Sequence, residues 1–171
     1  MLLVWIIVLP VAKFFLVNQI SEAEGTRISY QGGTYPVSPG KFLAAYEYNN
    51  THFKIMEISY LSGIGRSDFI EKINSTGSVP DASAYAQRAG KLYSTAVPQE
   101  IDYPVYSVSE NEDNGSVTVL LSDARNSYVE RWAYFRMVYR FVFDKESGEY
   151  EAYASEQEGR ERKLEGGNYF E

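Results

Sequence analysis

The chain has 171 residues, a formal net charge of −7 and no cysteine, and these facts exclude several classes of protein. Without cysteine it has no disulfide, no thiol nucleophile and no thiolate metal site. Residues 144–171 carry nine acidic and four basic side chains, a surface that repels phosphate groups and disfavours nucleic-acid binding. A body of about 145 residues buries roughly two-thirds of the surface of its unfolded chain, so it folds without a structural metal ion.

The N-terminal residues 1–20 predict a hydrophobic helix. Residues 1–17 read MLLVWIIVLPVAKFFLV, in which Lys13 is the only charged side chain and Pro10 interrupts the middle. The run is short for a transmembrane anchor, which needs about 20 apolar residues, and it lacks the basic residues that open a signal peptide. We interpret it as a retained membrane anchor; the alternatives are a signal peptide cleaved near Ala23 and a buried core helix. By analogy with signal-anchor proteins, we expect the body outside the cytoplasm, on the periplasmic side.

The chain after this segment predicts a linker and a first small element. Residues 21–40 are rich in Gly, Ser and Pro and are expected to form the linker, with one short strand near residues 26–30. A short helix is expected over residues 41–48, because its apolar side chains share one side. Those side chains are Phe42, Ala45 and Tyr46.

One strand and two helices are predicted next. Apolar residues alternate over residues 51–61, which indicates a strand. Asp68 is expected to begin a short helix, with Glu71 at the capping-box spacing. A longer helix is predicted over residues 81–94, where apolar residues recur at i, i+4 and i+7. The residues with this spacing are Tyr85, Ala89 and Leu92.

The C-terminal half predicts antiparallel strands. The dipeptide Asn114-Gly115 between two apolar segments is typical of a tight hairpin. Over residues 130–144 an apolar side chain stands at every odd position from Ala133 to Phe143, which is the period of a half-buried strand. The predicted strands cover residues 105–109, 117–121, 130–144 and 150–154.

This order of elements predicts an α+β fold. Short helices are expected to pack on a curved antiparallel sheet, with a meander of about four strands in the C-terminal half, preceded by the N-terminal hydrophobic helix. We expect a single α+β domain over residues 41–156 and a charged tail over residues 157–171.

The sequence contains no motif for catalysis or metal binding. His52 is the only histidine and there is no G-x-S-x-G motif, so a nucleophilic triad has no support. The acidic loop at residues 110–115 has the start of a calcium-loop pattern, but Leu121 occupies the position that needs a bidentate acid. Glu57, between apolar neighbours, is expected to face outward on its strand. We therefore predict no catalytic residue, no metal and no cofactor.

The candidate binding surface is the even-numbered face of the long predicted strand. Trp, Tyr and Arg are enriched at the energetic centres of protein interfaces. The two arginines of this face are expected either to bind an anionic partner or to pair with Glu149 and Glu151 on the neighbouring strand. The residues of this predicted patch are Trp132, Tyr134, Arg136 and Arg140.

These observations together predict a non-enzymatic, membrane-anchored or exported module of the cell envelope that binds a protein partner in or near the membrane. One alternative is an immunity-type inhibitor that blocks a toxin with its acidic surface. Two others are a carboxylate-dependent hydrolase acting on cell-wall glycans and a small-ligand binder with a tyrosine-lined pocket between helices and sheet.

Overall fold

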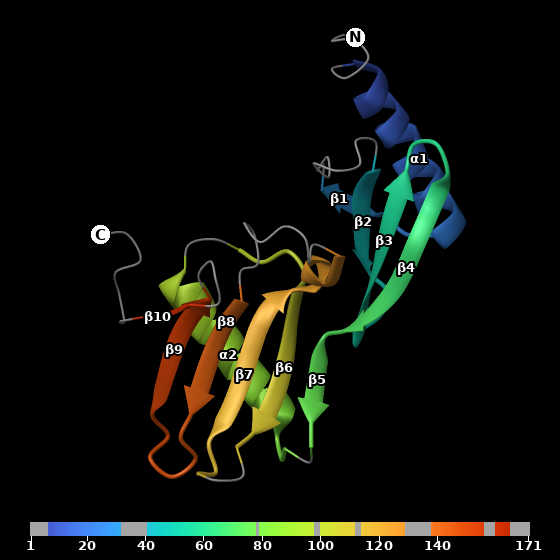
Figure 1. Cartoon of the computed structure of the whole chain (residues 1–171). Coiled ribbons are helices and arrows are strands. Elements are labelled where there is room, and N and C mark those ends of the chain that lie inside the picture. The colour runs from blue at the N-terminus through green and yellow to red at the C-terminus, as the bar shows by residue number, and fades with distance from the viewer. Residues whose placement is uncertain are drawn as a thin grey trace. The chain divides into compact units, whose positions relative to one another are not determined.

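The structure is a computed structural model with the predicted α+β fold. It describes residues 7–31, 41–77, 79–97, 100–111, 114–128, 138–155 and 160–164. The described residues form two α-helices and two sheets (Figure 1). The chain divides into two compact units, Met1–Ile70 and Glu71–Glu171.

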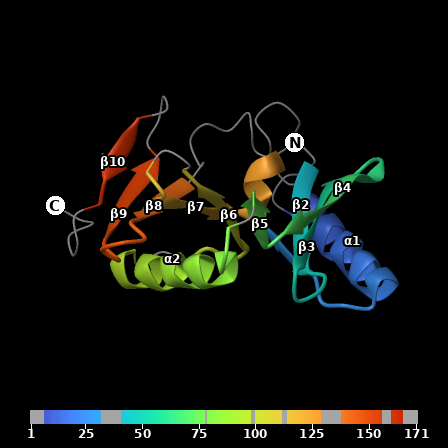
Figure 2. The ribbon, with the colours of Figure 1, turned by 90° about the horizontal axis from the view of Figure 1, so that it is seen from below.

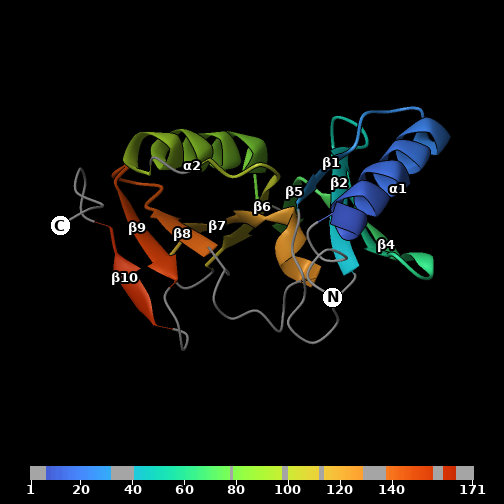
Figure 3. The same cartoon turned by 90° about the horizontal axis from the view of Figure 1, so that it is seen from above.

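The first unit is a four-stranded sheet with a helix against it. Its elements are α1 (Leu9–Glu24), β1 (Ser29–Gln31), β2 (Lys41–Glu47), β3 (His52–Ser59) and β4 (Gly63–Glu71). The strand order is β1-β2-β3-β4, and the pairs β1/β2 and β2/β3 are antiparallel. Helix α1 lies beside the sheet (Figure 3) and ends at Gly25, whose φ of 66° needs the freedom of glycine.

Helix α1 confirms the predicted N-terminal hydrophobic helix and is part of the core of the first unit. Val17 and Ile20 of α1 are buried against apolar side chains of β2 and β3. Burying one large aliphatic side chain contributes about 1.5–3 kcal/mol. The sheet residues of this core, called the first core below, are Phe42, Ala44, Tyr46, Met56 and Ile58, with Ile28 from the segment after α1.

Two helices predicted in the first unit are wrong, because both segments are strands. Residues 41–48 form β2, which pairs with β3 along its whole length, from Lys41↔Ser59 to Glu47↔Phe53. The segment expected to begin a helix at Asp68 lies inside β4. In each case pairing with a neighbouring strand satisfies the backbone N–H and C=O groups that a short helix leaves unpaired at its ends. The strand predicted over residues 51–61 is confirmed as β3.

The second unit is a six-stranded sheet with one helix on its face. Its elements are β5 (Ile73–Thr76), α2 (Ala82–Ala96), β6 (Pro104–Glu110), β7 (Val117–Asp123), the 3₁₀ helix η2 (Ala124–Tyr128), β8 (Val138–Phe143), β9 (Tyr150–Ser155) and β10 (Glu161–Lys163). The strand order is β10-β9-β8-β7-β6-β5. The predicted antiparallel meander is confirmed in β6 to β9, whereas β5 is parallel to β6 because α2 carries the chain back between them.

Helix α2 covers one face of this sheet (Figure 2). It confirms the helix predicted over residues 81–94. Its buried side chains are small, except for Tyr93, so the helix lies close to the strands. They pack on the inward-facing side chains of β7 and β8. The members of this second core on β7 and β8 are Val117, Val119, Leu121, Tyr139, Phe141 and Phe143.

The hairpin and the long strand agree with the sequence pattern wherever the structure describes them. Gly115 has a φ of 65° and its N–H donates to the carbonyl oxygen of Asn111 at 2.8 Å, which closes the predicted turn. In β8 every odd-numbered side chain is buried. Residues 130–137, the first part of the predicted strand, lie outside the described residues. Strand β10 adds residues 161–163 of the expected charged tail to the sheet.

Candidate functional site

Of the four residues predicted as a binding patch, the structure describes only Arg140. It lies on β8 opposite Tyr153 of β9, with its guanidinium 4.2 Å from the centre of that ring. Its Nε donates to Glu161 Oε1 on β10 at 2.9 Å. This hydrogen bond holds the pKa of Glu161 below, and that of Arg140 above, their ordinary values. Trp132, Tyr134 and Arg136 lie outside the described residues.

Arg140 is therefore engaged within the sheet, but with a different acid from those expected. The sequence pointed to Glu149 and Glu151, which precede or lie on β9. Glu151 instead accepts hydrogen bonds from Lys163 and from the Tyr153 hydroxyl. The result is a ladder of alternating charges across β8, β9 and β10, in which acids and bases compensate one another.

Helix α1 carries two apolar faces, and only one of them packs on the sheet. The outward-facing side chains recur at helical spacing and are each 48–62% exposed. Lys13, the single charged residue of the run, is buried on the inner side with its Nζ 5.2 Å from the centre of the Phe42 ring. The side chains of this surface, called the outer face of α1, are Val11, Phe14 and Phe15 of the helix, with Ile7 and Val8 from the helical turn that precedes it.

The C-terminal end of α1 is held to the sheet by a partly buried polar contact. Lys54 Nζ lies 2.7 Å from Glu24 Oε1, and the Tyr46 hydroxyl donates to Glu24 Oε2 at 2.6 Å. The bond from Lys54, followed by that from Tyr46, lowers the pKa of Glu24. Burial, with the bond to Glu24, raises the pKa of the Tyr46 hydroxyl. The orientation of α1, and so the direction of its outer face, is fixed by directional bonds as well as by packing.

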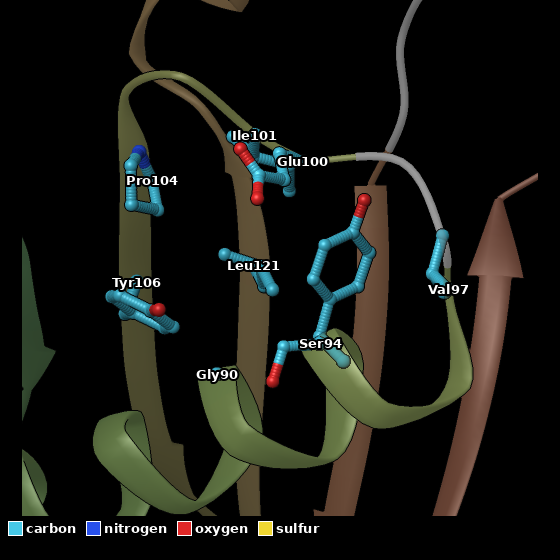
Figure 4. A pocket seen from close by; sticks show the side chains of 9 residues that line it. Gly90, Ser94, Val97, Glu100, Ile101, Pro104, Tyr106 and Leu121 are labelled. Carbon is cyan, nitrogen blue, oxygen red and sulfur yellow. The ribbon is translucent and has the colours of Figure 1, made fainter.

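A cavity of about 330 Å³ lies between α2 and the sheet of the second unit (Figure 4). Its apolar wall is formed by Val97, Ile101, Pro104 and Leu121. Two tyrosines, Tyr93 and Tyr106, and two other polar side chains, Ser94 and Glu100, complete the lining with Gly90 of α2. A small-ligand binder with a tyrosine-lined pocket is one of the alternatives considered from the sequence, but the residues of the pocket were not predicted. The signal that could have located it is Gly90, a glycine inside a helical pattern, which often marks a close approach.

His52 and Glu57, the other residues considered in the sequence for catalysis, each contact a neighbouring side chain of the fold. His52 is at the start of β3, with Nδ1 2.8 Å from the Thr51 hydroxyl. Glu57 forms an ion pair with Lys41 at 2.7 Å across β2 and β3. Over the described ranges, no group of three or more His, Asp or Glu side chains is placed to hold a metal ion. The described helices also include none with both the length and the apolar character needed to cross a bilayer.

Comparison with known proteins does not assign the chain to a family. No family model matches it, and no curated protein and no solved structure is significantly similar.

Proposed function

We propose that this protein is a non-enzymatic binding module of the cell envelope that attaches to a membrane through residues 1–20 and recruits a protein partner there. The observation that carries the proposal is the outer face of α1. Five large apolar side chains stand exposed along one side of α1 and of the turn before it, and the other side of the helix is packed. A contiguous exposed apolar surface of this kind marks an interaction site.

A lipid bilayer is the occupant that best fits the outer face of α1. The face is continuous in sequence with residues 1–6, MLLVWI, which are all apolar and include a tryptophan suited to the membrane interface. The one positive charge of the segment, Lys13, is turned toward the sheet and does not interrupt the face. Because the chain has a net charge of −7, the attraction is hydrophobic and does not depend on anionic lipids.

The same packing supports retention of the N-terminal segment. Cleavage near Ala23 would remove Val17 and Ile20, which are 5% and 7% exposed members of the first core. It would also separate most of α1 from the Glu24 contact with Lys54. We therefore propose a retained segment, with the body on the periplasmic side of the membrane.

The lining of the cavity supports a non-enzymatic role. A hydrolase acting through carboxylates needs two of them facing one space. Among the described residues that line the cavity, Glu100 is the only acid. The binding role is therefore assigned to surfaces, with the predicted patch at Trp132, Tyr134, Arg136 and Arg140 as the proposed partner site.

Membrane attachment is tested by vesicle flotation. Replacing Phe14 and Phe15 together with serine should lower the fraction of protein bound to uncharged phosphatidylcholine vesicles by about ten- to a hundredfold, because two half-exposed rings no longer enter the lipid. The control is the double variant Leu61→Ser with Ile64→Ser, which removes exposed apolar side chains from the β3–β4 hairpin. Equal flotation of both variants would contradict attachment through α1.

The partner site is tested by affinity capture of the full-length chain from detergent-solubilised membranes. The double variant Trp132→Ala with Arg136→Ala should reduce the captured amount of the stoichiometric partner by about tenfold or more, as expected for energetically central residues. The control is Leu61→Ala with Arg66→Ala, which removes one exposed apolar and one exposed basic side chain elsewhere. Capture that is unchanged in the first variant would show that the partner binds another surface.

A further inference from the structure

The cavity of the second unit has the size and lining of a small-molecule site. Its volume of about 330 Å³ falls in the range of roughly 300–1,000 Å³ that such sites occupy. One side is α2 and the other is the end of the sheet where β6 and β7 carry Tyr106 and Leu121. The lining combines an apolar wall with a few polar groups, which is the arrangement that orients a ligand.

Tyr106 places an unused hydroxyl group against this space. Within the described part of the chain the hydroxyl has no hydrogen-bond partner. Burial alone raises the pKa of Tyr106, so the group remains a neutral phenol that can donate a hydrogen bond and accept one. Its position depends on Gly90, because a methyl group on that residue would stand 2.5 Å from the hydroxyl oxygen. A half-buried hydroxyl without a partner indicates that a ligand or water completes its bonding.

The charged side chain in the lining determines whether the cavity favours a positively or a negatively charged ligand. Glu100 is exposed at the cavity and, among the described residues, forms no ion pair. Figure 4 shows its carboxylate and the side chains of Ser94 and Tyr106 around one space above α2. None of the described lining residues is basic. The carboxylate of Glu100 attracts a cation by charge and repels an anion.

We infer that this cavity binds an organic cation, an ammonium or guanidinium group on a compact apolar body. The cationic group lies at Glu100, and the apolar body contacts Val97, Ile101 and Leu121. This chemistry has two sources, a free amine and a lysine or arginine side chain that a partner protein inserts. The inference goes beyond membrane attachment and concerns side chains of the second unit only, so either proposal can fail without the other.

The test is a titration of the full-length protein in detergent, followed by ¹⁵N amide NMR. The probes are benzylammonium, benzyl alcohol and benzoate, which share a ring and differ in charge. Benzylammonium should shift the amides of Gly90, Ser94, Val97 and Tyr106 and bind about tenfold more tightly than the neutral alcohol. Benzoate should bind more weakly than either probe. Equal affinity for cation and alcohol, tighter binding of benzoate, or no shift at these amides would overturn the inference.

Two variants locate the interaction. Glu100→Gln should weaken benzylammonium binding about tenfold and leave the affinity for benzyl alcohol unchanged. Gly90→Ala should weaken both, because the added methyl displaces the Tyr106 hydroxyl, while alanine favours the helix and keeps α2 folded. The control Glu71→Gln removes an exposed acid of β4 and should change neither affinity. An equal loss in the two Glu→Gln variants would assign the effect to net charge and overturn the site.

A titration with a peptide distinguishes a free amine from a lysine or arginine side chain of a partner protein as the bound cation. Acetyl-Leu-Lys-Leu-amide presents the same ammonium group on a protein-like chain. Competition of this peptide with benzylammonium at the same amides, with higher affinity than the free amine, would identify a partner side chain as the occupant. Preference for the free amine would identify a small molecule. Both outcomes support a cation site, and failure of both probes to shift these amides overturns it.

Discussion

Phe143→Ala should lower the free energy of unfolding of the second unit by about 3–5 kcal/mol. The Phe143 side chain is fully buried. Its ring centre lies 5.5 Å from that of Tyr85 on α2 and 6.5 Å from that of Phe141 on the same strand. The Arg88 guanidinium lies 4.8 Å from its centre. Truncation leaves a cavity between α2, the sheet and the Arg88 guanidinium. The surrounding side chains relax only partly into such a cavity, so the lost contacts are not recovered.

The measurement is urea unfolding followed by circular dichroism, with Leu120→Ala as the matched control. Leu120 belongs to the same sheet but is 38% exposed, so its truncation should cost about 1 kcal/mol or less. The test is whether the free energy of unfolding falls further in Phe143→Ala than in Leu120→Ala. Similar losses for both variants would mean that α2 does not cover Phe143 in solution.

Ile20→Asp should unfold the first unit while leaving the second unit folded. Ile20 is 7% exposed in the first core, beside the side chains of β2 and β3. A carboxylate there either remains charged without a partner or takes up a proton, and the substitution costs on the order of 4 kcal/mol or more in either case. Hydrogen exchange at the amides of β2 and β3 measures the unfolding of the first unit. In Ile20→Asp the protection of these amides should be lost.

Phe14→Asp provides the matched comparison on the same helix. Phe14 is 55% exposed on the outer face of α1, so the charge is placed in solvent and exchange protection in β2 and β3 should not change. Vesicle binding, however, should fall, because a charge now interrupts the apolar face. Loss of protection in both variants would show that α1 is buried on both sides and would remove the basis for membrane attachment through its outer face.

The residues of β2 show why a helix was predicted where a strand forms. Phe42, Ala45 and Tyr46 satisfy the spacing of a helix, but Phe42 and Tyr46 also fit the alternation of a strand, with Ala44 between them on the same face. A segment of seven residues cannot distinguish the two periods. Pairing with β3 and burial under α1 decided the outcome. The capping-box spacing at Asp68 and Glu71 was overridden in the same way, by the hairpin from β3 to β4.

Helix α1 was predictable as a helix, but its inward face was not. By charge alone Lys13 would be placed in solvent and the two phenylalanines inside. The structure has the opposite arrangement, with Lys13 over the Phe42 ring and both Phe14 and Phe15 exposed. An apolar run has no polar face to orient it, so the docking of Val17 and Ile20 on the sheet sets the rotation of the helix.

The sequence by itself determined the α+β class, the helix α2, the Asn114-Gly115 hairpin and the buried face of β8. Each follows from a period or a turn signal that is complete within a few neighbouring residues. Only the tertiary structure decided β2 and β4, the outer face of α1 and the cavity that Gly90 and Tyr106 share. These depend on side chains that are distant in the chain and meet only when the sheets have formed, so no local pattern determines them. Gly90 in its helical pattern is a signal for the cavity, but it does not identify Tyr106 as the residue that packs there.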